Sequence, residues 1–78
     1  MNRSRRDKLR QALNLLKCAE ASIENICDEE KDSLDNVPEN LQSGDRFSMM
    51  EDVIDYLEDA IQNIQDAANS IDDALSCR

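Results

Sequence analysis

The sequence predicts an all-α fold, an antiparallel two-helix hairpin with heptad packing that dimerises into a four-helix bundle. Apolar residues recur every seven positions along most of the 78 residues, which is the period of packed helices. Aromatic residues make up 3% of the chain, with one glycine and one proline, too few for a β fold with its frequent turns. A chain of this length holds one small core, so we expect a single domain over residues 1–78.

The first helix is expected over residues 5–35. Leu9 and Leu16 begin a series that recurs every seven residues, and we letter this series position a of a heptad a to g. Further apolar residues follow three places later, at position d, and four places later, at position e. Ser4 is the expected N-cap, because its hydroxyl can accept a free backbone N–H while Asp7, three residues on, completes a capping box.

The connection is expected over residues 36–43. Pro38 excludes the residue before it from the helical region, so the first helix should end ahead of it. Proline also fits a first helical position, which allows a short helical turn from Pro38 through Leu41. We expect Leu41 to cover the end of the hairpin.

The second helix is expected over residues 44–77, with Ser43 favoured over Ser48 as its N-cap because this start keeps Phe47 within the apolar stripe. Three positions in seven are apolar, a stripe about 100° wide that suits a helix bundle. The small residues at position d should let the helix backbones approach closely. The apolar series is Met50, Leu57, Ile64 and Ile71 at a, Val53, Ala60, Ala67 and Ala74 at d, and Ile54, Ile61, Ala68 and Leu75 at e.

Charge favours an antiparallel arrangement of the two helices. Basic residues at a helix N-terminus oppose the helix dipole, and the chain begins with Arg3, Arg5 and Arg6. Antiparallel packing brings these residues beside Asp72, Asp73 and the end of the second helix, where opposite charges compensate each other. A lone hairpin buries little apolar area, so we expect a homodimer or a higher homo-oligomer.

Four aspartates repeat every seven residues along the second helix, at position c. We call Asp52, Asp59, Asp66 and Asp73 the acidic ladder. One interpretation is a solvated face. The other is a binding surface for a basic protein partner. The net charge of −9 would repel phosphate, so we do not expect nucleic-acid binding.

The residues needed for catalysis or metal binding do not form a recognisable pattern. The chain has no histidine, and its cysteines lack the paired spacing of a zinc site. Cys18 and Cys27 would lie about 13 Å apart on one helix, too far for a disulfide. Cys27 is expected in the core, Cys18 on the surface and Cys77 at a frayed end. We therefore expect no enzyme activity and no cofactor, and a cytoplasmic location, because no apolar run has the length of a membrane helix.

The connection carries a more specific motif. The stretch Asp-Asn-Val-Pro-Glu-Asn-Leu-Gln at residues 35–42 is followed by Arg46 and preceded by a basic start and an acidic first helix. This combination resembles a group of short acidic proteins encoded by phages and mobile elements of intestinal Gram-positive bacteria. The resemblance implies a helical hairpin and a mobile-element origin. With that origin, the expected cytoplasmic location is that of a bacterial host cell. The resemblance implies no particular activity.

Three functional hypotheses follow. In the first, the protein binds and blocks a host protein, as an inhibitor of host defence or an acidic mimic, through the acidic ladder or through Glu39 and Asn40 of the connection. In the second, a larger oligomer holds a small ligand between protomers, with arginines as anion contacts. In the third, the hairpin is a purely structural part of an assembly. The arginines of the second hypothesis are Arg3, Arg5, Arg6 and Arg10.

Overall fold

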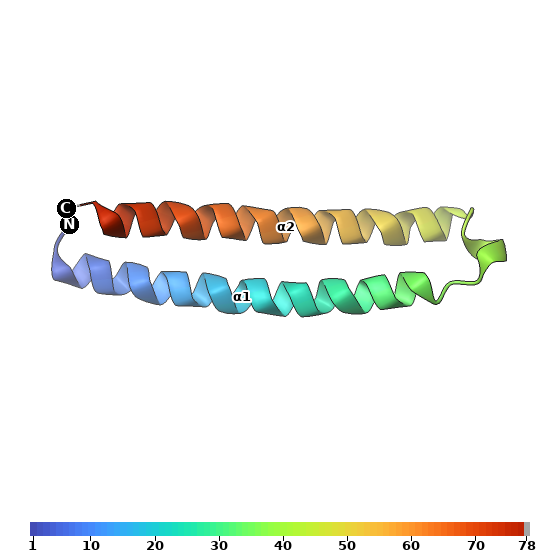
Figure 1. Ribbon diagram of the computed structural model, residues 1–78, viewed down its shortest axis with the longest axis horizontal. Coiled ribbons are helices and arrows are strands. Elements are labelled where there is room, and N and C mark those ends of the chain that lie inside the picture. The colour runs from blue at the N-terminus through green and yellow to red at the C-terminus, as the bar shows by residue number, and fades with distance from the viewer. Residues whose placement is uncertain (78) are drawn as a thin grey trace.

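The chain folds into two long antiparallel helices joined by a short connection, and the computed structural model describes residues 1–77 (Figure 1). Helix α1 spans Arg3–Asp35, helix α2 spans Asp45–Ser76, and a short 3₁₀ turn, η1, spans Glu39–Leu41 between them. The rod measures 60 × 15 × 13 Å. Residues 1–77 contain no strand, so the predicted all-α class with two helices is confirmed.

Asn2, and not Ser4, caps the N-terminus of α1. Asn2 has an extended backbone, with φ −79° and ψ 168°, and its Oδ1 accepts a hydrogen bond of 2.9 Å from the backbone N–H of Arg5. The prediction of a Ser4 cap is wrong because asparagine is at least as good a cap as serine. Starting the helix at Asn2 also adds two residues to it.

The connection contains the short helical turn expected after Pro38. Pro38 is the N-cap of η1, and its carbonyl accepts a hydrogen bond of 2.9 Å from the N–H of Leu41. The Leu41 side chain remains 56% exposed, so the expectation that it covers the hairpin end is wrong. It borders an open hollow of about 560 Å³, whose apolar lining is Val37, Pro38, Leu41, Phe47 and Met50.

Helix α2 begins at Asp45 with Gly44 as its N-cap, so the predicted Ser43 cap is also wrong. Gly44 has no side chain that could hydrogen-bond to the first turn of α2. The carboxylate of Asp45 stands at the positive end of the helix dipole, where a negative charge is favourable.

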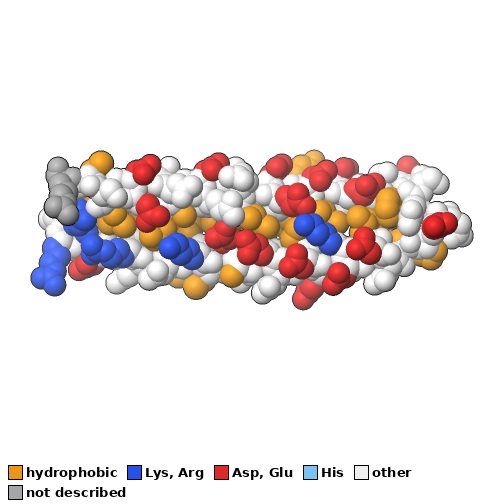
Figure 2. All heavy atoms as spheres, viewed as in Figure 1, with side chains coloured by type: hydrophobic (Ala, Val, Ile, Leu, Met, Phe, Trp, Pro, Cys, Tyr) orange, Lys and Arg blue, Asp and Glu red, His pale blue; other side chains and the backbone are white. Residues whose placement is uncertain are grey.

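The apolar side chains between the helices, which we call the seam, come from positions a and e. Within residues 1–77 four residues are buried, all at position e: Leu13, Cys27, Ile54 and Ala68. Figure 2 shows hydrophobic side chains running along the junction of the two helices. At position d, Ala19 and Ala67 are exposed, whereas Ala12, Ala60 and Ala74 are half-buried. Leucine and isoleucine at a and e bury more apolar area within the hairpin than alanine at d, and the close approach of backbones at d stays a prediction.

Candidate interaction surfaces

The acidic ladder is exposed along its whole length. At 100° per residue, position c lies on the side of α2 farthest from the seam. Asp66 Oδ1 accepts a hydrogen bond of 3.0 Å from Gln62 Nε2. Within residues 1–77, no Lys or Arg nitrogen lies within 4.0 Å of a ladder carboxylate. The ladder therefore offers its charges outward, away from the core of the rod.

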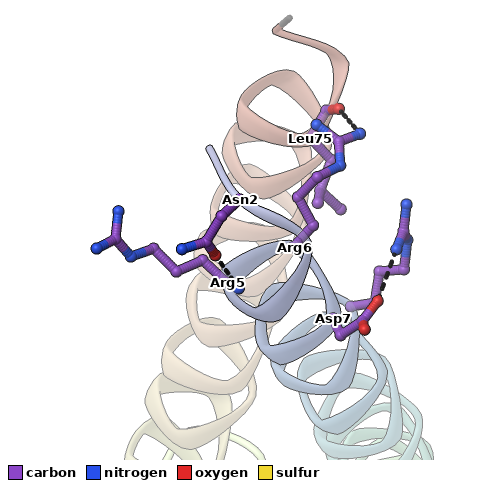
Figure 3. A network of polar contacts seen from close by, with 6 residues as sticks. Asn2, Arg5, Arg6, Asp7 and Leu75 are labelled. Atoms are coloured by element: carbon purple, nitrogen blue, oxygen red, sulfur yellow. Dashed lines mark hydrogen bonds and ion pairs between the residues drawn. The ribbon is translucent and has the colours of Figure 1, made fainter.

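Arg6 joins the two helices at the end of the rod where the chain starts. Its side chain is half-buried and reaches from α1 to the C-terminus of α2, as Figure 3 shows. Its Nη2 donates to the carbonyl oxygen of Leu75 at 2.6 Å, and its Nη1 donates to that of Cys77 at 3.5 Å. A cation at this place satisfies free carbonyl groups and the negative end of the helix dipole.

The predicted contact of the basic start with the end of the second helix is made by Arg6, whereas within residues 1–77 neither Asp72 nor Asp73 is in an ion pair. Arg6 instead donates hydrogen bonds to main-chain carbonyl groups at the C-terminus of α2. Arg3 and Arg5 are exposed. Another expected anion contact, Arg10, is paired with Asp7 on its own helix at 3.1 Å.

A second, open hollow of about 350 Å³ lies at the same end of the rod. It is lined by Met1, Arg5, Lys8 and Leu9. Two cations beside two apolar side chains are a chemically suitable lining for a small anion that carries an apolar part.

Glu39 and Asn40 are both exposed in η1, at the opposite end of the rod from the arginines. The connection is stabilised by hydrogen bonds between its own residues. Gln42 Nε2 donates to the carbonyl oxygen of Val37 at 3.2 Å. The N–H of Gln42 also donates to the carbonyl of Glu39 at 3.2 Å. The nine residues singled out from the sequence thus form three separate surfaces: the ladder along α2, the arginines at one end and the connection at the other.

Lys31 and Glu58 form an ion pair between the helices, with Nζ and Oε1 3.2 Å apart. The hydrogen bond to the Glu58 carboxylate, and then its charge, raise the pKa of Lys31 above its ordinary value of 10.5. Both side chains are about half exposed. Both residues occupy position b, so this pair identifies one flank of the seam as the polar flank.

The opposite flank carries a surface that the sequence interpretation missed. The helices hold five exposed large apolar side chains, with exposed fractions from 44% to 72%, and all five are at position d or g: Leu15, Ile26, Met49, Val53 and Tyr56. Positions d and g carry no charged residue between residues 12 and 26 or between residues 49 and 77. We call positions d and g of these two stretches the uncharged face. The heptad register carries this signal at position g, which lies outside the apolar stripe of positions a, d and e.

Both helices contribute to the same side of the rod. In an antiparallel pair, flanking positions with the same letter lie on the same side of the seam. The contact between Lys31 and Glu58 shows this for position b, and positions d and g therefore share the other side. The rod has one polar flank and one uncharged face.

Residues 1–77 bring together no group of three or more His, Cys, Asp or Glu side chains that could hold a metal ion. Cys27 is buried, and Cys18 and Cys77 are exposed; all three are free thiols. In the same residues, neither helix has a stretch long and apolar enough to cross a membrane.

Comparison with protein-family models, with curated proteins and with solved structures found no match to this chain. The functional interpretation therefore rests on the chemistry of its surfaces.

Proposed function

We propose that this chain is a non-enzymatic, self-associating helical interaction protein of phage or mobile-element origin that binds and blocks a basic host protein. In this proposal two hairpins form a four-helix bundle in the cytoplasm of a bacterial host cell, and the acidic ladder contacts the partner. An anti-defence inhibitor and an acidic mimic are two forms of the same function.

The observation that carries the proposal is the placement of the acidic ladder. Its carboxylates are exposed, recur on the side of α2 farthest from the seam, and have no basic partner within residues 1–77. A row of like charges along a rigid helix attracts a basic surface and speeds encounter with it. The resemblance of the connection motif supports the mobile-element origin.

The ladder is tested by replacing three of its members together, Asp52→Asn, Asp59→Asn and Asp66→Asn. Seven residues of helix span about 10.5 Å, close to the Debye length of about 10 Å at 0.1 M salt, so the repulsion within the ladder is weak. We expect the triple variant to keep the thermal stability and the mass of the wild type. Capture of a basic protein from host lysate should be lost.

The matched control removes three charges from the same helix outside the ladder, by Glu51→Gln, Asp55→Asn and Asp72→Asn. This control should still capture the partner, and capture by the wild type should fall steeply between about 0.1 and 0.5 M salt. Equal capture by both triple variants would exclude the ladder as the binding surface. The connection and the arginines would then be the candidates.

A second candidate function is favoured by the hollow at the basic end of the rod. Arg5 and Lys8 could bind the anionic part of a small ligand there, against Met1 and Leu9. A rise of the unfolding temperature with nucleotides, absent in Arg5→Gln, would support this function. If neither a basic protein nor a nucleotide binds, a purely structural role in an assembly is the remaining proposal.

A further inference from the structure

We infer that a second copy of this chain docks on the uncharged face in the opposite direction, with the two α1 helices crossing at Ala19. This inference rests on the self-association proposed above and names the surface and the orientation that produce it. The large exposed side chains of this face provide the apolar area, and the charges at its two ends select the orientation.

The uncharged face is too long to be a chance grouping of side chains. In a chain with 35% charged residues, positions d and g of α2 carry no charge from Met49 to the end of the helix at Ser76, about 40 Å of helix. With the 15 Å width of the rod, the footprint is about 600 Å² per copy, or about 1,200 Å² in total, which reaches the lower limit of stable interfaces. Leu15, Met49 and Tyr56 stand exposed on this face, and a second copy would cover them.

Charge along α1 determines the direction. Residues 3–10 contain five basic and one acidic residue, a net charge of +4, and residues 28–35 contain five acidic and one basic residue, a net charge of −4. Ala19 lies midway between these segments. When two α1 helices pack in opposite directions around Ala19, each positive segment lies beside a negative segment of the other copy. The same-direction arrangement places like charges together, which is unfavourable.

A matched pair of variants tests the surface. Ala19 and Ala21 are both exposed on α1, but Ala19 is on the uncharged face at d and Ala21 is on the polar side at f. Ala19→Glu should lower the mass measured by light scattering from two chains to one, with helicity retained, since the side chain lies outside the seam. Ala21→Glu should remain a dimer. If both variants remain dimers, the inferred surface is wrong although self-association still holds.

The orientation is tested with a spin label at Ser48→Cys in a background with Cys18→Ser and Cys77→Ser; Cys27 is buried and is left in place. Ser48 lies roughly 20 Å along the rod from the level of Ala19, so opposite directions separate the two labels by about 40 to 50 Å. Same-direction packing brings them within about 25 Å. A short distance in a dimer overturns the orientation. A monomeric wild type overturns both this inference and the proposed self-association.

Discussion

Replacing Arg6 with methionine is expected to destabilise the hairpin through the loss of a single cross-helix contact. The half-buried guanidinium donates to the carbonyl oxygen of Leu75 at 2.6 Å and to that of Cys77 at 3.5 Å. A partly buried cation at a helix C-terminus contributes up to about 2 kcal/mol, and water can hydrate the released carbonyls. We therefore expect a loss of about 1.5 kcal/mol, because methionine keeps the aliphatic packing of the side chain.

For a chain of this size, that loss corresponds to a fall of about 6 to 12 °C in the unfolding temperature. Thermal unfolding followed by circular dichroism, at one protein concentration, measures it. Arg3→Met is the control, since it removes the same charge from the same turn of α1 but the Arg3 side chain is exposed. The control should leave the unfolding temperature unchanged or slightly raise it, because Arg3 opposes the dipole of α1. Equal shifts for Arg3→Met and Arg6→Met would refute a specific role for the carbonyl contact.

Three further predictions concern other contacts of the rod. Asn2→Ala should lower the free energy of unfolding by about 1 kcal/mol, and Asn2→Ser should restore most of it, as measured by urea unfolding. Phe47→Ala should cost about 2 kcal/mol and Leu41→Asp less than about 0.5 kcal/mol, because Phe47 is half-buried in the seam and Leu41 is mostly exposed; the reverse order would show that Leu41 covers the hairpin end. The folded-state pKa of Lys31 is raised, so its contribution to stability is complete below pH 10.5 and is lost as the pH rises through the higher folded value. The small stability difference between wild type and Lys31→Gln should therefore be constant from pH 7 to about 10 and disappear at higher pH, and a difference that persists there would contradict the ion pair with Glu58.

The helical hairpin could be predicted because its determinants repeat along the sequence. A heptad period sustained through both halves specifies two amphipathic helices, and Pro38 specifies where the first must end. The outward placement of the acidic ladder also follows from the register, since position c lies far from any apolar stripe. The cysteines could be placed in the same way, with Cys27 in the core and Cys18 on the surface.

The choice of packing positions could not be predicted from apolar character alone. Positions a, d and e are all mostly apolar. In the single hairpin, α1 and α2 pack against each other through the larger side chains at a and e, and Ala19 and Ala67 at d remain exposed. The difference in side-chain size decides this, because each additional methylene group buried contributes about 0.8 kcal/mol. The uncharged face could not be predicted from the apolar stripe, because Leu15 and Tyr56 are large apolar residues at position g, outside that stripe.

The N-cap residues of both helices were wrongly predicted, because several local hydrogen bonds compete there. Asn2 and Ser4 are both good caps, and only the geometry of the chain selects Asn2. The hydrogen-bond partners of Arg6 follow from its position e, beside the seam. From this position its side chain reaches the carbonyl groups at the end of α2. Charge patterning indicated the antiparallel arrangement but not which oxygen atoms would accept.

The contacts between the two helices close chain loops that become longer from the connection toward the termini. Loop length should therefore determine the order in which these contacts form. Lys31 and Glu58 are 27 residues apart in the sequence, and Arg6 and Leu75 are 69 residues apart. Closing the longer loop directly costs about 0.8 kcal/mol more chain entropy, so we expect the helices to zip together from the connection toward the termini. A contact formed after the transition state influences the unfolding rate and leaves the folding rate nearly unchanged. The interaction of Arg6 with α2 should therefore slow the opening of the hairpin and contribute little to the speed of its formation.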